Sequence, residues 1–333
     1  MRILLALGNA ADTGGPTKYA QQLLPALRHR GHVVELVSYA PWLWRVPFGL
    51  RHVCFALQLL PATRRSDIVL GFDTMTVGMP LWLLSHLARI PYALRIGGDF
   101  VWEQFVESTG RLVKLSKFYE TSKIPLKQRI EIWLTGLVVR RAKALMFNSG
   151  WQRELWRRHY AFNPAKAHVV ENMYPPRKLG ETVSKRVFVA AGRAIKLKQE
   201  PLLRKVFENL KQKYPDIELD TQALLPDEHQ ARVARCYAVV LPSVSDVSPN
   251  SIIDAVTYGK PFVCTSDTGI RERLEGTGLF VDTGDEHALS AAIESLLDPA
   301  IYAQVESRVK AFTHVRTWDD VAVDVEQILK KTI

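Results

Sequence analysis

The feature that most restricts the fold of this chain is a pattern of short apolar segments that alternate with helical patterns. A first series lies at residues 2–7, 33–37, 68–70, 93–96, 144–147 and 168–170, and a second at 187–191, 217–220, 238–241 and 262–265. Short apolar strands separated by helices are typical of parallel sheets that are covered on both faces. Because the series is repeated, the sequence predicts an α/β protein with two Rossmann-like, doubly wound domains.

The boundary between the two series is a polar stretch that begins with Pro175 and Pro176. Proline pairs mark connections between elements, so this stretch favours a linker. We expect a first domain at residues 1–174 and a second at 182–315. Residues 316–333 carry apolar side chains at helical spacing, and we expect this amphipathic helix to pack back on the first domain. Asp319 and Asp320 open that helix and are expected to cap it.

The composition is that of a globular protein with reduced thiols. Of the 333 residues, 47% are hydrophobic and 23% are charged. The three cysteines show no CxxC spacing, so we expect no disulfide bond. The first apolar run, at residues 3–7, is too short for a signal peptide, and no run reaches the roughly 18 residues that a spanning helix needs. We expect a cytoplasmic protein.

The net charge of +10 is distributed unevenly along the chain. Residues 1–175 hold 23 of the 44 Lys and Arg but only 11 of the 34 Asp and Glu. A basic half of this kind suits a phosphorylated substrate, an anionic lipid surface or nucleic acid. The charge is the only sign of nucleic acid binding, since no recognition motif is present, and we expect no nucleic acid partner.

The richest polar stretch, at residues 241–255, joins a predicted strand to a predicted helix. Ser248 is a good N-cap and Pro249 fits the first helical position, so the backbone N–H groups of Asn250, Ser251 and Ile252 would face an anion. Asp246 precedes this helix and Asp254 lies within it. Both carboxylates can accept hydrogen bonds from sugar or ribose hydroxyls. A capped helix with a solvated Asp is the alternative interpretation.

A second polar cluster follows the strand predicted at residues 187–191. Gly192 and Arg193 come first, and Lys198 stands five residues after the arginine. Cations at the carboxyl edge of a parallel sheet can hold a diphosphate. Two solvated surface cations are the alternative.

Together these motifs resemble the retaining glycosyltransferases of family 4, which have the GT-B fold. That family carries Gly-Arg with a Lys five residues later, and a Glu-x7-Glu motif after Pro-Ser that is followed by Gly-x-Pro. The matching residues here are Gly192-Arg193, Lys198, Pro242-Ser243, Asp246, Asp254 and Gly259-Lys260-Pro261. Further matches are Gly14-Gly15 after the first strand, Asn172 at the end of the first domain, and Glu272 after Gly269. The resemblance covers essentially the whole chain.

The resemblance implies a nucleotide-sugar cleft between the two domains. It implies that Arg193 and Lys198 stabilise the departing diphosphate, that Asp246 binds hydroxyls of the donor sugar, and that Asp254 binds the ribose. It also implies that Gly14 and Gly15 let the backbone approach the donor phosphate. The sequence departs from the family in two ways: both acidic positions are Asp instead of Glu, and Lys198 is followed by Gln199 instead of Gly.

Another candidate for the active site is residues 95–103, which follow a predicted strand. Asp99 or Glu103 could contact the sugar or the acceptor hydroxyl, and a Gly-rich turn with a capping Asp is the alternative. The nine histidines show neither HxH nor HExxH spacing. The resemblance also implies metal-independent chemistry, so we expect no metal and no cofactor.

Residues 41–65 mix aromatic, aliphatic and basic side chains, as do residues 111–141. Such mixtures suit the surface of an anionic membrane, and buried helices with snorkelling arginines are the alternative. A protein bound there would lie on the inner face of the cytoplasmic membrane, where its acceptor could be a lipid-linked saccharide.

The sequence thus predicts a glycosyltransferase that moves a hexose from a UDP- or GDP-hexose to a saccharide or lipid-linked saccharide, with retention, in cell-surface polysaccharide or glycolipid synthesis. A non-catalytic GT-B protein that binds nucleotide sugars is the alternative, motivated by the two Asp residues. A Rossmann oxidoreductase is disfavoured because Gly8 does not open a GxGxxG motif. A GT-B epimerase or phosphorylase is a weaker alternative.

Overall fold

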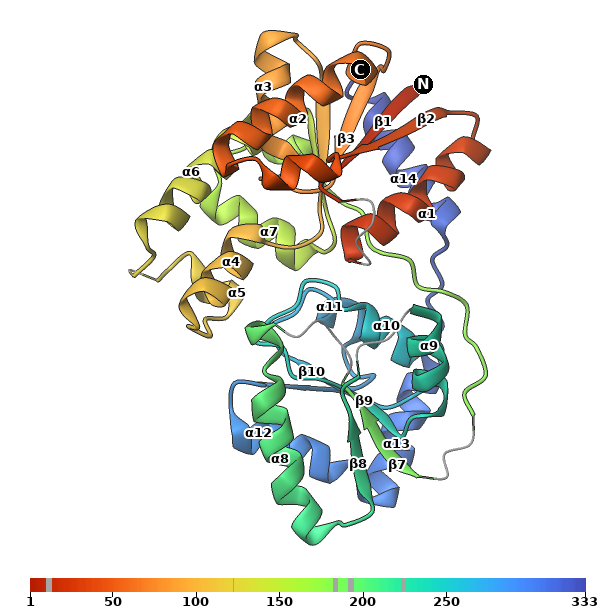
Figure 1. The fold of residues 1–333 in the computed structure, drawn as a ribbon. Coiled ribbons are helices and arrows are strands. Elements are labelled where there is room, and N and C mark those ends of the chain that lie inside the picture. Colours follow the sequence, from red (N-terminus) through yellow and green to blue (C-terminus); the bar gives the residue numbers. More distant parts are fainter. Residues whose placement is uncertain (10–13, 122, 182–184, 191–194, 223–225) are drawn as a thin grey trace. The chain divides into compact units, whose positions relative to one another are not determined.

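The computed structural model describes residues 1–9, 14–121, 123–181, 185–190, 195–222 and 226–333 (Figure 1). The chain divides into two compact units. Unit 1 contains residues 1–101, 122–173 and 316–333, and unit 2 contains residues 102–121 and 174–315. Each has its own parallel sheet and its own apolar core.

The sheet of unit 1 has six strands in the order β2-β1-β3-β4-β5-β6, and all neighbours are parallel. The strands are β1 (Arg2–Leu7), β2 (Val33–Ser38), β3 (Ile68–Gly71), β4 (Tyr92–Ile96), β5 (Ala144–Phe147) and β6 (Ala167–Val169). After β1 the chain adds β2 on one side and then β3 on the other. The loops after β1 and β3 therefore flank the point where the strand order reverses, which is where open α/β sheets bind ligands.

Helices cover the sheet of unit 1 and are held to it by apolar side chains. They are α1 (Gly15–His29), the 3-10 helix η1 (Pro41–Arg45), α2 (Phe48–Thr63), α3 (Gly78–Leu87), α6 (Leu126–Arg141), α7 (Gly150–His159), η2 (Pro164–Lys166) and α14 (Trp318–Lys330). No helix in the described part of the chain is long and apolar enough to cross a membrane.

The last helix, α14, belongs to the core of unit 1 (Figure 1). Its Val321, Val325 and Leu329 lie in one buried cluster with Leu23 and Leu27 of α1. The helix begins with a capping box, in which Thr317 and Asp320 exchange side-chain and backbone hydrogen bonds. The predicted amphipathic helix is confirmed, and of the acidic pair expected to cap it, Asp320 takes part in the capping box.

The sheet of unit 2 has five parallel strands in the order β11-β10-β9-β7-β8. They are β7 (Arg186–Val189), β8 (Ile217–Asp220), β9 (Ala238–Leu241), β10 (Phe262–Thr265) and β11 (Leu279–Val281). The strand order reverses between β7 and β9, so the loops after these two strands flank the expected ligand position in this unit.

The helices of unit 2 are η3 (Lys196–Lys198), α8 (Glu200–Lys213), α9 (Pro226–Arg235), α10 (Asn250–Thr257), α11 (Arg271–Leu274), α12 (Glu286–Ser295) and α13 (Pro299–Ala311). Nearly all of α4 (Phe100–Thr109) and the whole of α5 (Leu115–Phe118) also belong to unit 2. The ring centroids of Phe105 in α4 and Phe118 in α5 lie 5.2 Å apart, and both side chains are buried.

The structure confirms the predicted fold of two Rossmann-like parallel-sheet units. Every strand predicted from an apolar run is present with bounds shifted by at most two residues. Two features differ from the expectation. The edge strand β11 was not predicted, and residues 102–121 lie in unit 2, whereas the sequence predicted that all of residues 1–174 form the first domain.

Candidate functional site

A cation and a carboxylate meet where the strand order of unit 2 reverses. Lys198 follows β7 and Asp246 follows β9, and Lys198 Nζ lies 2.9 Å from Asp246 Oδ2. Each side chain is about one-fifth exposed, so solvent or a ligand can reach the pair. Asp246 Oδ1 accepts a hydrogen bond from the backbone N–H of Ser248 at 3.2 Å. The carboxylate is thus oriented by its own loop and by the lysine.

The short helix η3 that carries Lys198 is fixed at both ends. The carboxylate of Glu107 in α4 accepts from the backbone N–H groups of Lys196 at 3.2 Å and Leu197 at 3.3 Å. The carbonyl of Leu197 accepts from the N–H of Val244 at 2.9 Å, which ties η3 to the loop that contains Asp246. Glu107 is a positioning residue that the sequence did not reveal, because it precedes Lys198 by about ninety positions.

Gln199 explains one departure from the family pattern. Its φ of 48° lies in the left-handed region, where glycine is the favoured residue. The Gln199 side chain is buried and its Nε2 donates to the carbonyls of Pro242 at 2.8 Å and Thr283 at 3.3 Å. A glycine would adopt this φ without strain but could not make these two hydrogen bonds. The glutamine makes both bonds and keeps the left-handed backbone.

A second polar network holds the loop from the side of α5. Ser245 Oγ donates to the carboxylate of Asp267 and accepts from the N–H of Leu115 at 2.8 Å. The N–H of Ser116 also donates to Asp267, at 3.3 Å. The backbone of Asp246 pairs with the segment around Thr268. Residues from three parts of the sequence therefore fix the position of Asp246.

Helix α10 begins one residue later than the sequence predicted. Its N-cap is Pro249 instead of Ser248, it starts at Asn250, and the N-cap makes no side-chain bond. Ser248 therefore precedes the N-cap, and its backbone N–H donates to the carboxylate of Asp246. Asn250 and Ser251 remain at least partly exposed and Ile252 is buried.

Asp254 lies one turn into α10 and faces α9. His229 Nε2 lies 3.7 Å from Asp254 Oδ2, and Gln230 Nε2 donates to Asp254 Oδ1 at 3.4 Å. The Asp254 side chain is only 16% exposed. A ribose that binds this carboxylate must therefore share it with side chains of α9.

In unit 1, Gly14 and Gly15 stand where the loop after β1 enters α1. Gly14 is the N-cap and Gly15 the first helical residue. A Cβ placed on Gly15 would meet no atom of the described residues within 4 Å. Packing inside the described part of unit 1 therefore does not require a glycine here.

Asp73 flanks the same reversal point from the other side and was missed by the sequence reasoning. It follows β3, and the backbone N–H of Val77 donates to its Oδ1 at 2.9 Å. Burial raises the pKa of Asp73 to about 6, even though several backbone N–H groups stabilise the charged form. A lone Asp after a strand gives no signal that distinguishes it from a turn residue.

The candidate residues between β4 and α4 fall into different environments. Asp99 is buried in unit 1, and the neighbouring carbonyls of Gly97 and Gly98 accept from the amides of Asn148 and Gln152. Glu103 is half-buried and belongs to unit 2.

Asn172 is part of a buried cluster in unit 1. Its Oδ1 accepts from Arg95 Nη2 at 2.9 Å. The guanidinium of Arg95 lies 4.6 Å from the ring centroid of Tyr19, and burial lowers the pKa of this arginine. In the described structure Asn172 thus anchors a buried cation.

Three further predictions concern unit 2. Glu272 lies exposed on α11. Gly192 and Arg193 lie outside the described residues. No group of three His, Cys, Asp or Glu side chains in the described ranges could hold a metal ion.

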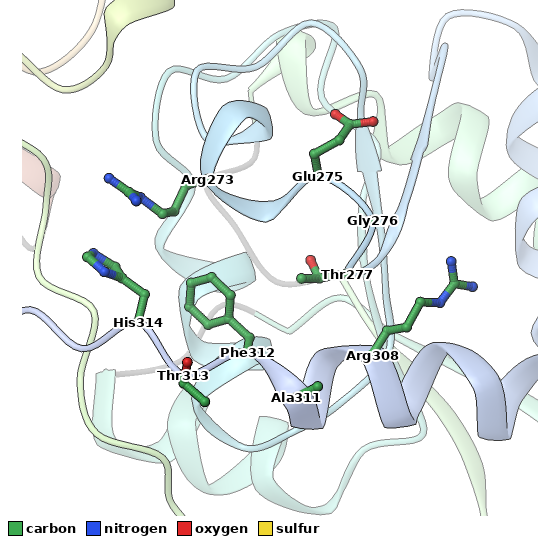
Figure 2. Close-up of a pocket in the computed structure, with 9 residues that line it drawn as sticks. All are labelled: Arg273, Glu275, Gly276, Thr277, Arg308, Ala311, Phe312, Thr313 and His314. Carbon is green, nitrogen blue, oxygen red and sulfur yellow. The ribbon is translucent and has the colours of Figure 1, made fainter.

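An open hollow lies on unit 2 (Figure 2). It has a volume of about 440 Å³ and is lined by Arg273, Glu275, Gly276, Thr277, Arg308, Ala311, Phe312, Thr313 and His314. Figure 2 shows Arg273 and His314 pointing to one side and Arg308 to the other. None of the predicted site residues lines it.

Comparisons with known families match both halves of the chain. Residues 14–173 match the model of the glycosyl transferase 4-like domain. Residues 179–299 match the model described as glycosyl transferases group 1. Comparison with the curated proteins finds no match.

Solved structures with the same fold match the chain over almost its whole length. Sucrose-phosphate synthase from Thermosynechococcus elongatus superposes with a TM-score of 0.72 at 16% identity, covering 99% of each chain. Anabaena HepE in complex with UDP-glucose gives 0.66 at 13%, covering 98% of this chain and 99% of its own. The lipopolysaccharide outer core galactosyltransferase WaaB gives 0.65 at 12%, covering 100% of both chains. At these identities the likeness shows a common fold.

Proposed function

Because this chain belongs to the family-4-like glycosyltransferases with the GT-B fold, we propose that it transfers a hexose from a UDP- or GDP-hexose to a saccharide or lipid-linked saccharide, with retention of the anomeric configuration. The observation that carries this proposal is the Lys198–Asp246 pair at the reversal point of the unit 2 sheet. Parallel sheets bind nucleotides at this position. The pair supplies a cation for the phosphates and a carboxylate for sugar hydroxyls.

Lys198 and Arg193 act on the leaving group. Cleavage of the glycosidic bond places negative charge on the departing diphosphate and positive character on the sugar ring. A cation held in advance stabilises that charge without reorganising in the transition state. Glu107 and Val244 support this role, because they fix the backbone of η3 on which Lys198 stands.

The remaining predicted residues bind the donor and the acceptor. Asp246 orients hydroxyls of the sugar, Asp254 binds the ribose, and the exposed start of α10 faces a phosphate. A Cβ at Gly15 would meet none of the described residues, which supports close approach of the donor phosphate to the backbone here. Asp99, Glu103, Asn172 and Glu272 are the candidates for contacts to the acceptor or the sugar, and no metal takes part.

The structural neighbours support the donor class and the pathway. HepE was solved with UDP-glucose, and WaaB is described as a galactosyltransferase of the lipopolysaccharide outer core. A basic unit 1 suits work at an anionic membrane, so the proposed pathway is cell-surface polysaccharide or glycolipid synthesis on the cytoplasmic side.

A second function is a non-catalytic protein that binds nucleotide sugars. The observation that favours it is the engagement of Asp254 by His229 and Gln230, together with the shorter Asp at both acidic positions. Such a protein would bind a donor without releasing its nucleotide.

A donor panel separates the two functions. UDP-, GDP- and ADP-hexoses are tested first by thermal shift and then for nucleotide release with saccharide acceptors, and the product anomer is determined by NMR. The enzyme should release nucleotide from one donor class and give a product with the donor's anomeric configuration. Stabilisation without release would support the binding protein, and an inverted product would refute retention. No response to any donor would refute both functions.

A further inference from the structure

Helix α2 has an apolar stripe on the side that faces solvent. Leu50, Val53 and Leu57 are spaced by three and four residues, so they lie on one face of the helix. Leu57 is 64% exposed and Leu50 57% exposed. Pro61 and Arg64 continue the same face and are also exposed.

The opposite face of α2 is already buried in unit 1. Phe55, Ala56 and Leu59 lie on that face and are almost fully covered. The helix is therefore apolar on both sides, although only one side is covered by the residues that the structure describes. A helix that is hydrophobic all round is normally buried in a protein or in lipid. The outer stripe thus indicates a missing partner.

Exposed aromatic rings extend the stripe beyond the start of α2. Trp42 and Trp44 of η1 are 55% and 45% exposed, and Phe48 opens α2. The guanidinium of Arg51 lies 5.4 Å from the Trp44 ring and 5.0 Å from the Phe48 ring. We name the set Trp42, Trp44, Phe48, Leu50, Val53 and Leu57 the α2 surface.

The segment that carries the α2 surface contains basic residues and no acidic ones. No Asp or Glu occurs from residue 36 to residue 66, whereas Arg45, Arg51, Arg64 and Arg65 lie in this segment. Arg45 and Arg64 are exposed at the two ends of the surface, and the exposed Arg65 lies 3.9 Å from Glu35. A second copy of the chain would bring arginines against arginines across a two-fold interface. Lipid phosphates offer the complementary charge.

We propose that the α2 surface docks on an anionic lipid membrane. Its tryptophans and aliphatic side chains enter the interfacial layer, and Arg45 and Arg64 contact lipid phosphates. Tryptophan at the interface with arginine beside it is the arrangement that interfacial helices use. The inference rests on unit 1 alone and does not depend on the transfer reaction.

Helix α6 carries a second exposed apolar stripe, and the experiment must distinguish its contribution from that of the α2 surface. It consists of Leu126, Ile130 and Trp133, of which Trp133 is 61% exposed. Helix α3 packs against both α2 and α6 (Figure 1). The proposal assigns the primary contact to the α2 surface. The segment around it, residues 36–66, contains four arginines and no Asp or Glu.

Co-sedimentation of the full-length protein with vesicles tests the proposal. Phosphatidylglycerol–phosphatidylcholine vesicles should bind the protein, pure phosphatidylcholine should bind it less, and salt should weaken the difference. The double variant Leu50→Ser/Leu57→Ser should reduce binding at least about tenfold, since each leucine contributes more than 1 kcal/mol when buried. Arg45→Gln/Arg64→Gln should reduce binding to anionic vesicles about fivefold per arginine.

Two controls make the outcome decisive. Leu179→Ser changes an equally apolar and almost fully exposed residue of unit 2, and it should bind like the wild type. Leu126→Ser/Trp133→Ser tests the α6 stripe and should bind nearly as well. Circular dichroism and nucleotide release on a soluble acceptor should be the same for all variants.

The proposal is overturned if the wild type ignores anionic vesicles, or if Leu50→Ser/Leu57→Ser binds them unchanged. It is also overturned if the wild type is a dimer by light scattering and the same variant converts it to a monomer without affecting vesicle binding, because the surface is then a protein interface. Loss of nucleotide release in every protein would refute the proposed function and leave the binding result intact.

Discussion

The ammonium of Lys198 and the carboxylate of Asp246 form an ion pair of 2.9 Å across the reversal point of the unit 2 sheet. Each group keeps the other in position in the described structure, so the site is ordered in advance of a ligand. Under the proposed function, the donor diphosphate would attract Lys198 while sugar hydroxyls take its place on Asp246.

Removal of the cation should affect the chemical step more than donor binding. Lys198→Ala should lower kcat about 100-fold, because one charge-assisted contact to a developing oxyanion contributes roughly 3 kcal/mol. The donor KM should change much less. The matched control is Lys205→Ala, which breaks an exposed pair with Glu286 of 2.8 Å on the same unit. Equal kinetics for both variants would show that Lys198 does not act on the leaving group.

Asp254 should show the opposite kinetic pattern. A ribose contact is similar in the ground state and the transition state, so Asp254→Ala should raise the donor KM about 10- to 100-fold with little change in kcat. Gln230→Ala removes the neighbouring amide and keeps the carboxylate, and its donor KM should not rise. Steady-state kinetics with varied donor concentration measure both. A fall in kcat alone for Asp254→Ala would contradict the ribose role.

Gln199 allows the backbone and side-chain contributions to be separated. Gln199→Ala loses the bonds to Pro242 and Thr283 and keeps a left-handed φ of 48°. Gln199→Gly loses the same bonds but removes the strain of a non-glycine residue at this φ. Urea unfolding should show both variants to be less stable than the wild type, with the alanine variant lower than the glycine variant by about 1 kcal/mol. Equal stability of the two variants would mean that the backbone carries no strain.

Asp73 should make unit 1 less stable as the pH rises. Its pKa is raised from 3.8 to about 6 in the folded protein, so the native state binds the proton more tightly than the unfolded state. The stabilisation is complete below pH 3.8 and is lost as the pH rises through 6. Between pH 4 and pH 7, Asp73→Asn should gain up to about 3 kcal/mol relative to the wild type. Denaturant unfolding at both pH values measures this, with the exposed Asp319→Asn as control. A gain that is independent of pH would contradict it.

The sequence predicted the strands well because each buried strand is a short apolar run. Leu279–Val281 was missed, although it is an apolar edge strand as short as Ala167–Val169, which was predicted. The start of α10 was misplaced by one residue, since Ser248 and Pro249 both fit the start of a helix and only the turn at Asp246 decides between them.

The parts of the site that the sequence could not predict are those built from distant segments. Apolar spacing shows that Phe105 and Phe118 are buried, but it does not show in which core. The contacts of Glu107 with η3, and of Ser245 with Leu115, depend on that placement. Asp73 was missed because its raised pKa comes from burial and not from its neighbours in the sequence.

The assignment of residues 102–121 to unit 2 has a consequence for exchanging parts between related enzymes. The chain passes between the units after Val101, Thr121, Met173 and Val315. In a chimera joined only near residue 174, the foreign half would carry η3 with Lys198 but not the Glu107 that fixes η3. Its α14 would also lack the native α1 against which it packs. Donor preference should therefore transfer between relatives only when α4, α5 and the half after residue 174 are moved together, with α14 left behind.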